Sequence, residues 1–229
     1  MYSTFKTLAL ATIIGVAMIC NPTAGIAGDD GAKVGYKKGF FIQDGDDFLL
    51  RTSARVQSRL TYEKPDEGDD ELFFNLPRVR LAFSGHAFNK DWTYKFQTDF
   101  GKGQASLKDF YVDYAASKGV FHIRVGQQKR PFSRQLINSS SKLVLVDRAL
   151  TAGSKAFELG RDIGVVLHNN MTKSPTFAWS LGILNGASVK STVDGTKITN
   201  GIDHFEPAIV ARVGYNHGKL KGYSEADLE

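Results

Sequence analysis

The sequence predicts an all-β protein, a transmembrane antiparallel up-and-down β-barrel, on the basis of three observations. Apolar and polar residues alternate through eight long segments, as they do in strands that separate two environments. Short turns and longer loops follow these segments in alternation, except after the third segment, and this sorting is typical of outer-membrane barrels. The mean hydropathy is −0.22, and beyond the N-terminus no apolar run reaches the roughly 18 to 20 residues of a spanning helix. A soluble β-sandwich is the alternative, but it gives no reason for sorted loop lengths.

Residues 1–27 have the pattern of a secretory signal peptide. Lys6 is followed by an apolar run from Leu8 to Ile19, and small residues stand where a signal peptidase reads the chain. We predict cleavage after Ala27, since a retained anchor would need a longer apolar run. Cleavage removes Cys20, the only cysteine, so the mature chain has no thiol chemistry.

Residues 28–47 are expected to form a periplasmic leader and a first short strand. Segment 28–38 is polar, segment 39–43 has the composition of a strand, and the run from Asp44 to Asp47 predicts a turn. Residues 48–229 are then expected to belong to the barrel.

The segment from Phe48 to Tyr62 predicts the first full strand of the barrel wall. One of its faces is mostly apolar, and the other carries Arg51, Arg55 and Arg59 in a column. In a membrane barrel the apolar face meets lipid and the arginines line a wet lumen. Seven further strands are predicted at 76–88, 92–100, 107–114, 120–128, 162–168, 177–184 and 206–215.

Two stretches between the strands break the alternation. Residues 63–71 are acidic and are expected to form a solvated loop, with cation bridging to lipopolysaccharide as the alternative. Residues 129–160 show no long alternation, and a stretch of that length is typical of a functional loop. This loop would narrow the pore if it folded inward, and a surface loop is the alternative. Its basic residues include Lys129, Arg130, Arg134, Lys142 and Arg148.

Charge on the predicted inward faces is mostly positive. Acids on these faces are Asp99, Asp109 and Asp113. Arginine and lysine ladders select anions, and guanidinium groups match phosphate oxygens in pairs. Structural ion pairs that brace the barrel wall are the alternative for each arginine. The candidate pore-lining bases are Arg51, Arg55, Arg59, Arg78, Arg80, Lys95, Arg124 and Arg212.

Motifs of catalysis are absent from the sequence. There is no G-x-S-x-G, H-E-x-x-H or P-loop pattern, and the five histidines lack metal-ligand spacing. No basic helix is present to dock nucleic acid. We therefore expect neither an enzyme nor a nucleic-acid partner, and the sequence predicts no metal and no cofactor.

Several blocks of sequence, taken in order, resemble the phosphate-selective porins of the O and P type. The most specific begins with the run VGQQKRPF at 125–132 and ends with GRDIGV at 160–165, with Ser139-Ser140 and Asp147-Arg148 between them. Together the blocks cover most of residues 39–216. The others are NLPRVRL at 75–81, LKDFYVDY at 107–114 and GILNG at 182–186.

This resemblance implies a porin of the bacterial outer membrane with sixteen strands, usually trimeric, whose third external loop folds into the channel. Residues 129–160 lie at the position of that loop. The partners implied are outer-membrane lipid, lipopolysaccharide and phosphate or other small anions. The expected function is passive diffusion of phosphate or polyphosphate through a channel lined by arginine and lysine.

Two questions stay open at the level of sequence. The chain ends at Glu229 without a terminal aromatic residue and holds about half the implied strands, so we expect a fragment of a longer porin. A small closed barrel without a water-filled pore is the alternative. A barrel with an anchoring or adhesin role, and a secreted soluble β-protein that binds polyanions, are the alternative functions.

Overall fold

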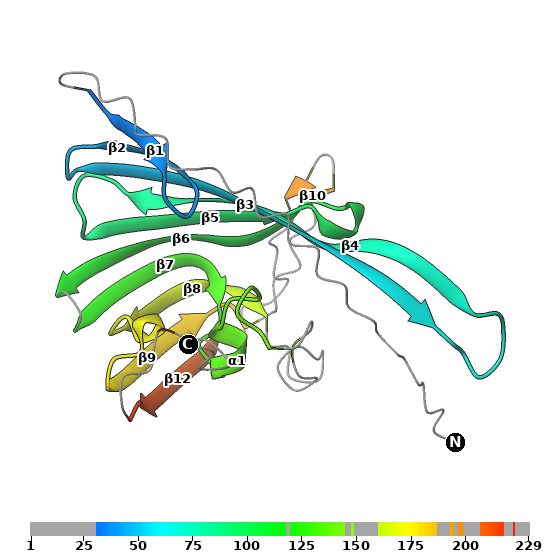
Figure 1. The fold of residues 1–229 in the computed structure, drawn as a ribbon. Coiled ribbons are helices and arrows are strands. Elements are labelled where there is room, and N and C mark those ends of the chain that lie inside the picture. Colours follow the sequence, from blue (N-terminus) through cyan, green and yellow to red (C-terminus); the bar gives the residue numbers. More distant parts are fainter. Residues whose placement is uncertain are drawn as a thin grey trace.

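The structure is a computed structural model, drawn as a ribbon in Figure 1. The predicted signal peptide lies outside the residues that it describes. These are residues 31–117, 120–144, 148, 160–186, 193–194, 197–198, 207–217 and 222.

Ten strands form one antiparallel sheet in which every strand pairs with its neighbours along the chain (Figure 1). β12 pairs with β9, because the intervening β10 (Val193–Asp194) and β11 (Lys197–Ile198) form a separate ribbon. This topology confirms the predicted all-β, up-and-down fold. The strands of the sheet are β1 (Lys33–Tyr36), β2 (Phe40–Asp44), β3 (Phe48–Glu63), β4 (Glu71–His86), β5 (Trp92–Asp99), β6 (Ser106–Ser117), β7 (Phe121–Lys129), β8 (Arg161–His168), β9 (Phe177–Leu184) and β12 (Ala208–Tyr215).

Helical structure is short in the described part of the chain. It consists of η1 (Gly101–Gly103), α1 (Arg134–Ile137) and η3 (Met171–Lys173). Among the described residues, no helix is long and apolar enough to cross a bilayer. β1 and β12 are the two edges of the sheet, so the ten described strands do not close on themselves.

One face of the sheet carries exposed apolar side chains in rows that cross the strands. Val112, Val125, Val165, Ile183 and Ile209 are register partners on five successive strands, and each is at least 41% exposed. A contiguous apolar row left open across a sheet needs a covering, which lipid supplies in a membrane barrel. Aromatic rings continue this face at Phe83, Phe96 and Phe110, which pack side by side.

The opposite face is polar and partly buried. Asp99, Asp109, Asp113, His122 and His168 are all at most 9% exposed, although each carries a polar or charged group. Buried charged groups are found where partners compensate them. The two faces therefore have the apolar and polar characters that the alternation predicts.

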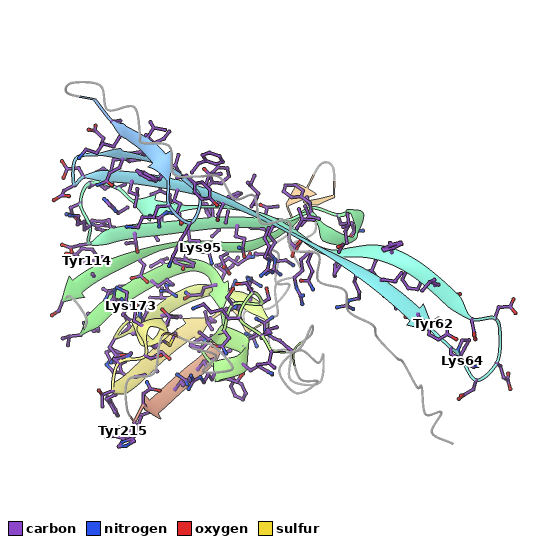
Figure 2. The ribbon with its side chains drawn as sticks, viewed as in Figure 1. Tyr62, Lys64, Lys95, Tyr114, Lys173 and Tyr215 are labelled. Atoms are coloured by element: carbon purple, nitrogen blue, oxygen red, sulfur yellow. The ribbon has the colours of Figure 1, made fainter. Side chains whose placement is uncertain are left out.

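The part of the sheet formed by β1 to β4 is larger than the sequence predicts, because it gains an extra strand and a longer hairpin. Segment 28–38, predicted as a polar leader, contains β1, because Lys33–Tyr36 finds a partner in β2 across the Gly39 turn. β4 begins at Glu71 and pairs with β3 as far as Glu63, which shortens the predicted acidic loop. The outer half of this hairpin projects beyond the other strands, with Tyr62 and Lys64 at its far end (Figure 2).

Short connections lie together at the opposite end of the sheet, where Tyr114 and Tyr215 are seen in Figure 2. Lys90 in the β4–β5 turn lies 2.6 Å from Asp46 in the β2–β3 turn. The hydrogen bond from Lys90 lowers the pKa of the exposed Asp46 carboxyl below its ordinary value. The long connections 130–160 and 185–207 leave the other end, as the sequence predicts. The short connection between β5 and β6 lies at that end too and is the exception to the sorting of loop lengths.

Gly126 of β7 is expected to be intolerant of a side chain. Its φ is +127°, and a Cβ there would lie 2.3 Å from the Phe110 carbonyl oxygen on β6. Gly126→Ala should lower the free energy of unfolding by about 2 kcal/mol or more, because it adds backbone strain and a clash. The measurement is the urea midpoint in detergent micelles. The control is Gly31→Ala, where a Cβ meets nothing within 4 Å, and equal midpoints for the two variants would contradict the prediction.

Candidate functional site

Two arginines of the hairpin β3–β4 face each other on the polar side of the sheet. Arg55 and Arg80 are direct cross-strand partners, an arrangement of like charges that is unfavourable unless other groups compensate it. Asp99 of β5 accepts a hydrogen bond from Arg80 Nε at 2.7 Å. The Ser140 hydroxyl accepts from Arg55 Nη2 at 2.6 Å and from Arg80 Nη1 at 2.8 Å. Both guanidinium groups therefore converge on one oxygen atom.

A second group of charges surrounds Asp109 on β6. Its two carboxylate oxygens accept from Lys95 Nζ and Arg161 Nε, each at 2.6 Å. Arg124 of β7 lies next to this group, with its guanidinium carbon 4.4 Å from the centre of the Tyr111 ring. Four strands, β5 to β8, thus contribute charges to one region of the wall.

The segment that follows β7 folds back over this region. Ser133 caps α1 by accepting from the Leu136 backbone N–H at 3.1 Å. Lys129 Nζ donates to the carbonyl oxygens of Ile137 and Asn138 at 3.0 and 2.6 Å. Arg148 Nη2 donates to the same Asn138 oxygen at 2.6 Å. These cations hold the loop backbone in place, so that the serines at 139–141 line the space between loop and wall.

A cavity of about 300 Å³ lies between this loop segment and the sheet. Its lining includes one carboxylate, that of Asp109, and the hydroxyls of the serine run. Within the described residues, Arg55 contacts no carboxylate, so its charge is not neutralised by ion pairing. The basic residues around the cavity are Arg55, Arg80, Lys95, Arg124, Lys129 and Arg161.

Five of the candidate residues from the sequence are brought together at this cavity, namely Arg55, Arg80, Lys95, Arg124 and Lys129. Arg161 was not among the candidates, and neither was Ser140. Arg161 is the first residue of β8, and only the register of β8 beside β7 reveals that it reaches Asp109.

The remaining candidates lie elsewhere. Arg78 donates to Gln57 at 2.7 Å and lines a neighbouring hollow with Lys108. Arg130 is held in a buried ion pair with Asp162 at 2.8 Å, outside the lining of the cavity. Three of the arginines are placed by strand register: Arg51 lies opposite Ser84, Arg59 opposite Asn75 and Arg212 opposite Ser180. Arg134 is in α1, and Lys142 is exposed in the loop.

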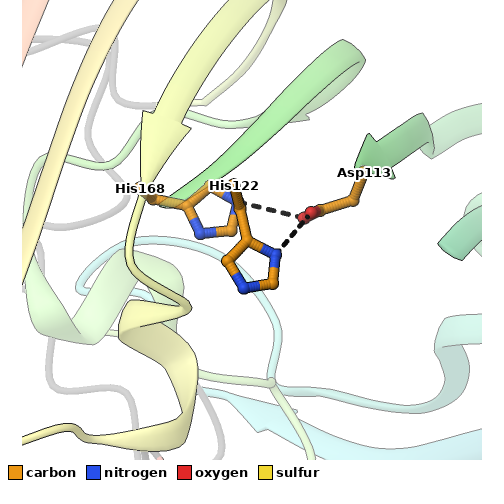
Figure 3. A group of neighbouring side chains, drawn as sticks. All are labelled: Asp113, His122 and His168. Atoms are coloured by element: carbon orange, nitrogen blue, oxygen red, sulfur yellow. Dashed lines mark hydrogen bonds and ion pairs between the residues drawn. The ribbon is translucent and has the colours of Figure 1, made fainter. Parts of the chain in front are cut away.

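A third polar cluster joins three strands near the short turns. Asp113 accepts hydrogen bonds from His122 Nδ1 at 3.1 Å and from His168 Nε2 at 3.0 Å (Figure 3). Arg124 Nη2 lies 2.5 Å from the same carboxylate. The two histidines are far apart in the sequence, but His122 and His168 are register partners on β7 and β8.

The sheet has an exposed apolar face and a buried charged face, and a basic cavity lies beneath a folded loop. These are the features expected of a wall segment of an outer-membrane barrel. A comparison with family models agrees with this class: residues 51–211 match the family of phosphate-selective porins O and P. The chain belongs to this family. A search of curated proteins found no match. As a member of an outer-membrane porin family, the chain is assigned to the bacterial outer membrane.

Proposed function

We propose that the sheet forms part of the wall of a passive anion channel and that the cavity beside Ser140 is its anion-binding constriction. The observation that carries the proposal is the convergence of Arg55 and Arg80 on the Ser140 oxygen. An oxyanion with an oxygen at this position would accept hydrogen bonds from the same two guanidinium groups.

The charge balance of the cavity supports an anion as the permeating species. Six basic side chains surround the cavity, and three carboxylates contact them, those of Asp99, Asp109 and Asp113. The excess positive charge attracts anions and replaces part of their hydration shell. Guanidinium groups donate hydrogen bonds in parallel pairs, a geometry that suits the oxygens of phosphate and polyphosphate.

Serine hydroxyls and a half-buried lysine complete the proposed constriction. Lys129 Nζ fixes the loop backbone by donating to the carbonyl oxygens of Ile137 and Asn138. An entering phosphate would exchange water for guanidinium, ammonium and hydroxyl groups that are already in place, so little reorganisation is needed. In this account residues 129–160 are the constriction loop.

Three further properties are proposed on the basis of family membership. They are cleavage of residues 1–27 on export, assembly into a trimer, and contact of the apolar face with lipid and lipopolysaccharide. The exposed apolar row across five strands supports the last of these.

Block of chloride current by phosphate tests the proposed function. The full-length protein is reconstituted in a planar bilayer in chloride, and phosphate is added in steps. We expect a saturable decrease of the chloride current, because phosphate resides longer in the constriction. A chloride current that phosphate leaves unchanged at every concentration would contradict phosphate binding at this site.

A further inference from the structure

The turn between β8 and β9 touches the proposed constriction from the end of the sheet that carries the short connections. It contains η3, whose Met171 is buried and packs against Ala178 of β9. Ile137, the last residue of α1, packs against the same pair. Met171 and Thr172 also line the cavity beside Ser140. A turn from one end of the sheet therefore meets the loop that leaves the other end.

The backbone of this turn has an uncommon conformation. Asn170 and Ser174, which flank η3, have φ values of +58° and +54°, in the left-handed region that residues other than glycine seldom adopt. Such conformations cost free energy and persist where surrounding contacts impose them. The Asn169 side chain donates to the Phe177 carbonyl oxygen at 2.6 Å and accepts from the Trp179 backbone N–H at 2.9 Å. These two bonds join the base of the turn to β9.

His168, the last residue of β8, supplies the contact at the start of η3. Its Nδ1 accepts the Asn170 backbone N–H at 2.9 Å and carries no proton, so the ring proton is on Nε2. Nε2 donates this proton to Asp113 at 3.0 Å (Figure 3). A metal ion on Nε2 would require a proton on Nδ1, opposite the Asn170 N–H. The three groups are therefore a hydrogen-bonded chain from β6 to the turn.

Asp113 is itself held in place by its neighbours. Arg124 Nε and Nη2 lie 2.7 and 2.5 Å from one of its oxygens, and His122 Nδ1 lies 3.1 Å from the other. The His122 ring also stacks on that of His168, with centroids 5.1 Å apart. Because His168 is almost completely buried among these groups, its ring is held in the orientation that presents Nδ1 to Asn170.

We propose that His168 is a positioning residue of the anion site: it holds η3 against α1, and η3 in turn keeps the loop and Ser140 at the constriction. The inference rests on the proposed anion channel and adds a support for its loop from the opposite end of the sheet. Ile137, which packs on Met171, also gives its carbonyl oxygen to Lys129 Nζ at 3.0 Å. Ser140, three residues further on, accepts from the two arginines of the wall.

Two substitutions separate the two hydrogen bonds of His168. In His168→Asn the amide oxygen takes the place of Nδ1 and can accept the Asn170 N–H, whereas the donor to Asp113 is lost. In His168→Gln the amide nitrogen takes the place of Nε2 and can donate to Asp113, whereas the Asn170 N–H loses its acceptor. His168→Gln should therefore release η3, and His168→Asn should retain it.

Phosphate block of the single-channel chloride current of the full-length protein measures the effect. We expect the half-blocking phosphate concentration to rise about fivefold in His168→Gln, because a typical hydrogen bond contributes roughly that factor to an equilibrium. It should stay close to the wild-type value in His168→Asn. Loss of stability alone would lower the number of channels and leave the half-blocking concentration unchanged.

Two further variants complete this experiment. Met171→Ala leaves His168 intact but removes the packing on Ile137, so it should also weaken the block. The control is His86→Gln, which changes another largely buried histidine, on β4, and should leave the block unchanged.

A cross-link tests the contact between turn and loop without any current. Ile137→Cys/Met171→Cys introduces two thiols, which a short bifunctional maleimide can join in micelles. We expect a cross-link in the otherwise wild-type protein and a yield several times lower when His168→Gln is added. The natural cysteine, Cys20, lies in the predicted signal peptide.

Outcomes separate the inference from the proposed function. Wild-type block in His168→Gln, equal block in His168→Gln and His168→Asn, or a cross-link yield that His168→Gln leaves unchanged would overturn the inference alone. A wild-type channel that phosphate does not block would contradict the proposed function, and the cross-link yield then decides whether His168 positions the turn. If His168→Gln does not fold, Met171→Ala decides, and wild-type block in that variant would overturn the inference.

Discussion

Replacement of Arg55 by glutamine is expected to weaken phosphate block of the chloride current about tenfold. A hydrogen bond from a charged donor contributes about 1.5–3 kcal/mol, and 1.4 kcal/mol corresponds to a factor of ten in affinity. Arg55 contacts no carboxylate among the described residues, so its removal leaves no acid unpaired. The double variant Arg55→Gln/Arg80→Gln should weaken phosphate block about 100-fold, although it also removes the ion pair of Asp99 with Arg80. The measurement is the phosphate concentration that halves the current.

The matched control for this experiment removes the same charge at a distant point. Lys64→Gln changes an exposed residue at the far end of the β3–β4 hairpin and should leave the block unchanged (Figure 2). Arg55→Lys should fall between wild type and Arg55→Gln, because ammonium keeps the charge but loses the paired donors. Equal phosphate block in Arg55→Gln and Lys64→Gln would contradict the assignment of Arg55.

Replacement of Asp162 by asparagine is expected to cost about 3–5 kcal/mol of folding stability. Asp162 is fully buried and accepts from Arg130, from its neighbour Ile163 and from the Gly186 backbone N–H. The variant keeps a similar shape but leaves the Arg130 charge buried without its counterion. The measurement is the urea midpoint for unfolding in detergent, followed by heat-modifiable migration on gels.

An exposed aspartate provides the comparison for this second prediction. Asp46→Asn removes a surface ion pair with Lys90, which is expected to contribute little to stability. A midpoint for Asp162→Asn no lower than that for Asp46→Asn would show that the buried pair does not stabilise the fold.

The sequence predicts the strands well wherever alternation is long and strict. β9 was predicted over Phe177–Leu184, as observed, and β3 was predicted to begin at Phe48. β1 was missed because four residues with a lysine at one end carry too little alternation to identify a strand. It exists because β2 offers it a partner, and pairing between strands is not visible in local patterns.

The site was predicted less completely, for a related reason. The inward faces of single strands identified Arg55, Arg80 and Lys95, because side chains alternate regularly across a strand. Ion pairing depends on register across several strands. Because of that register, Arg130 is held in an ion pair by Asp162, whereas its neighbour Lys129 lines the cavity. The same register joins His122 to His168, which are far apart in the sequence.

The reversal potential of the full-length protein in a tenfold gradient of potassium chloride tests the central claim most directly. The excess of bases around the cavity predicts that chloride carries most of the current, so the potential has the sign of an anion-selective channel. It should move toward zero in Arg55→Gln. A wild-type reversal potential of zero, or one with the sign of cation selectivity, would contradict the account.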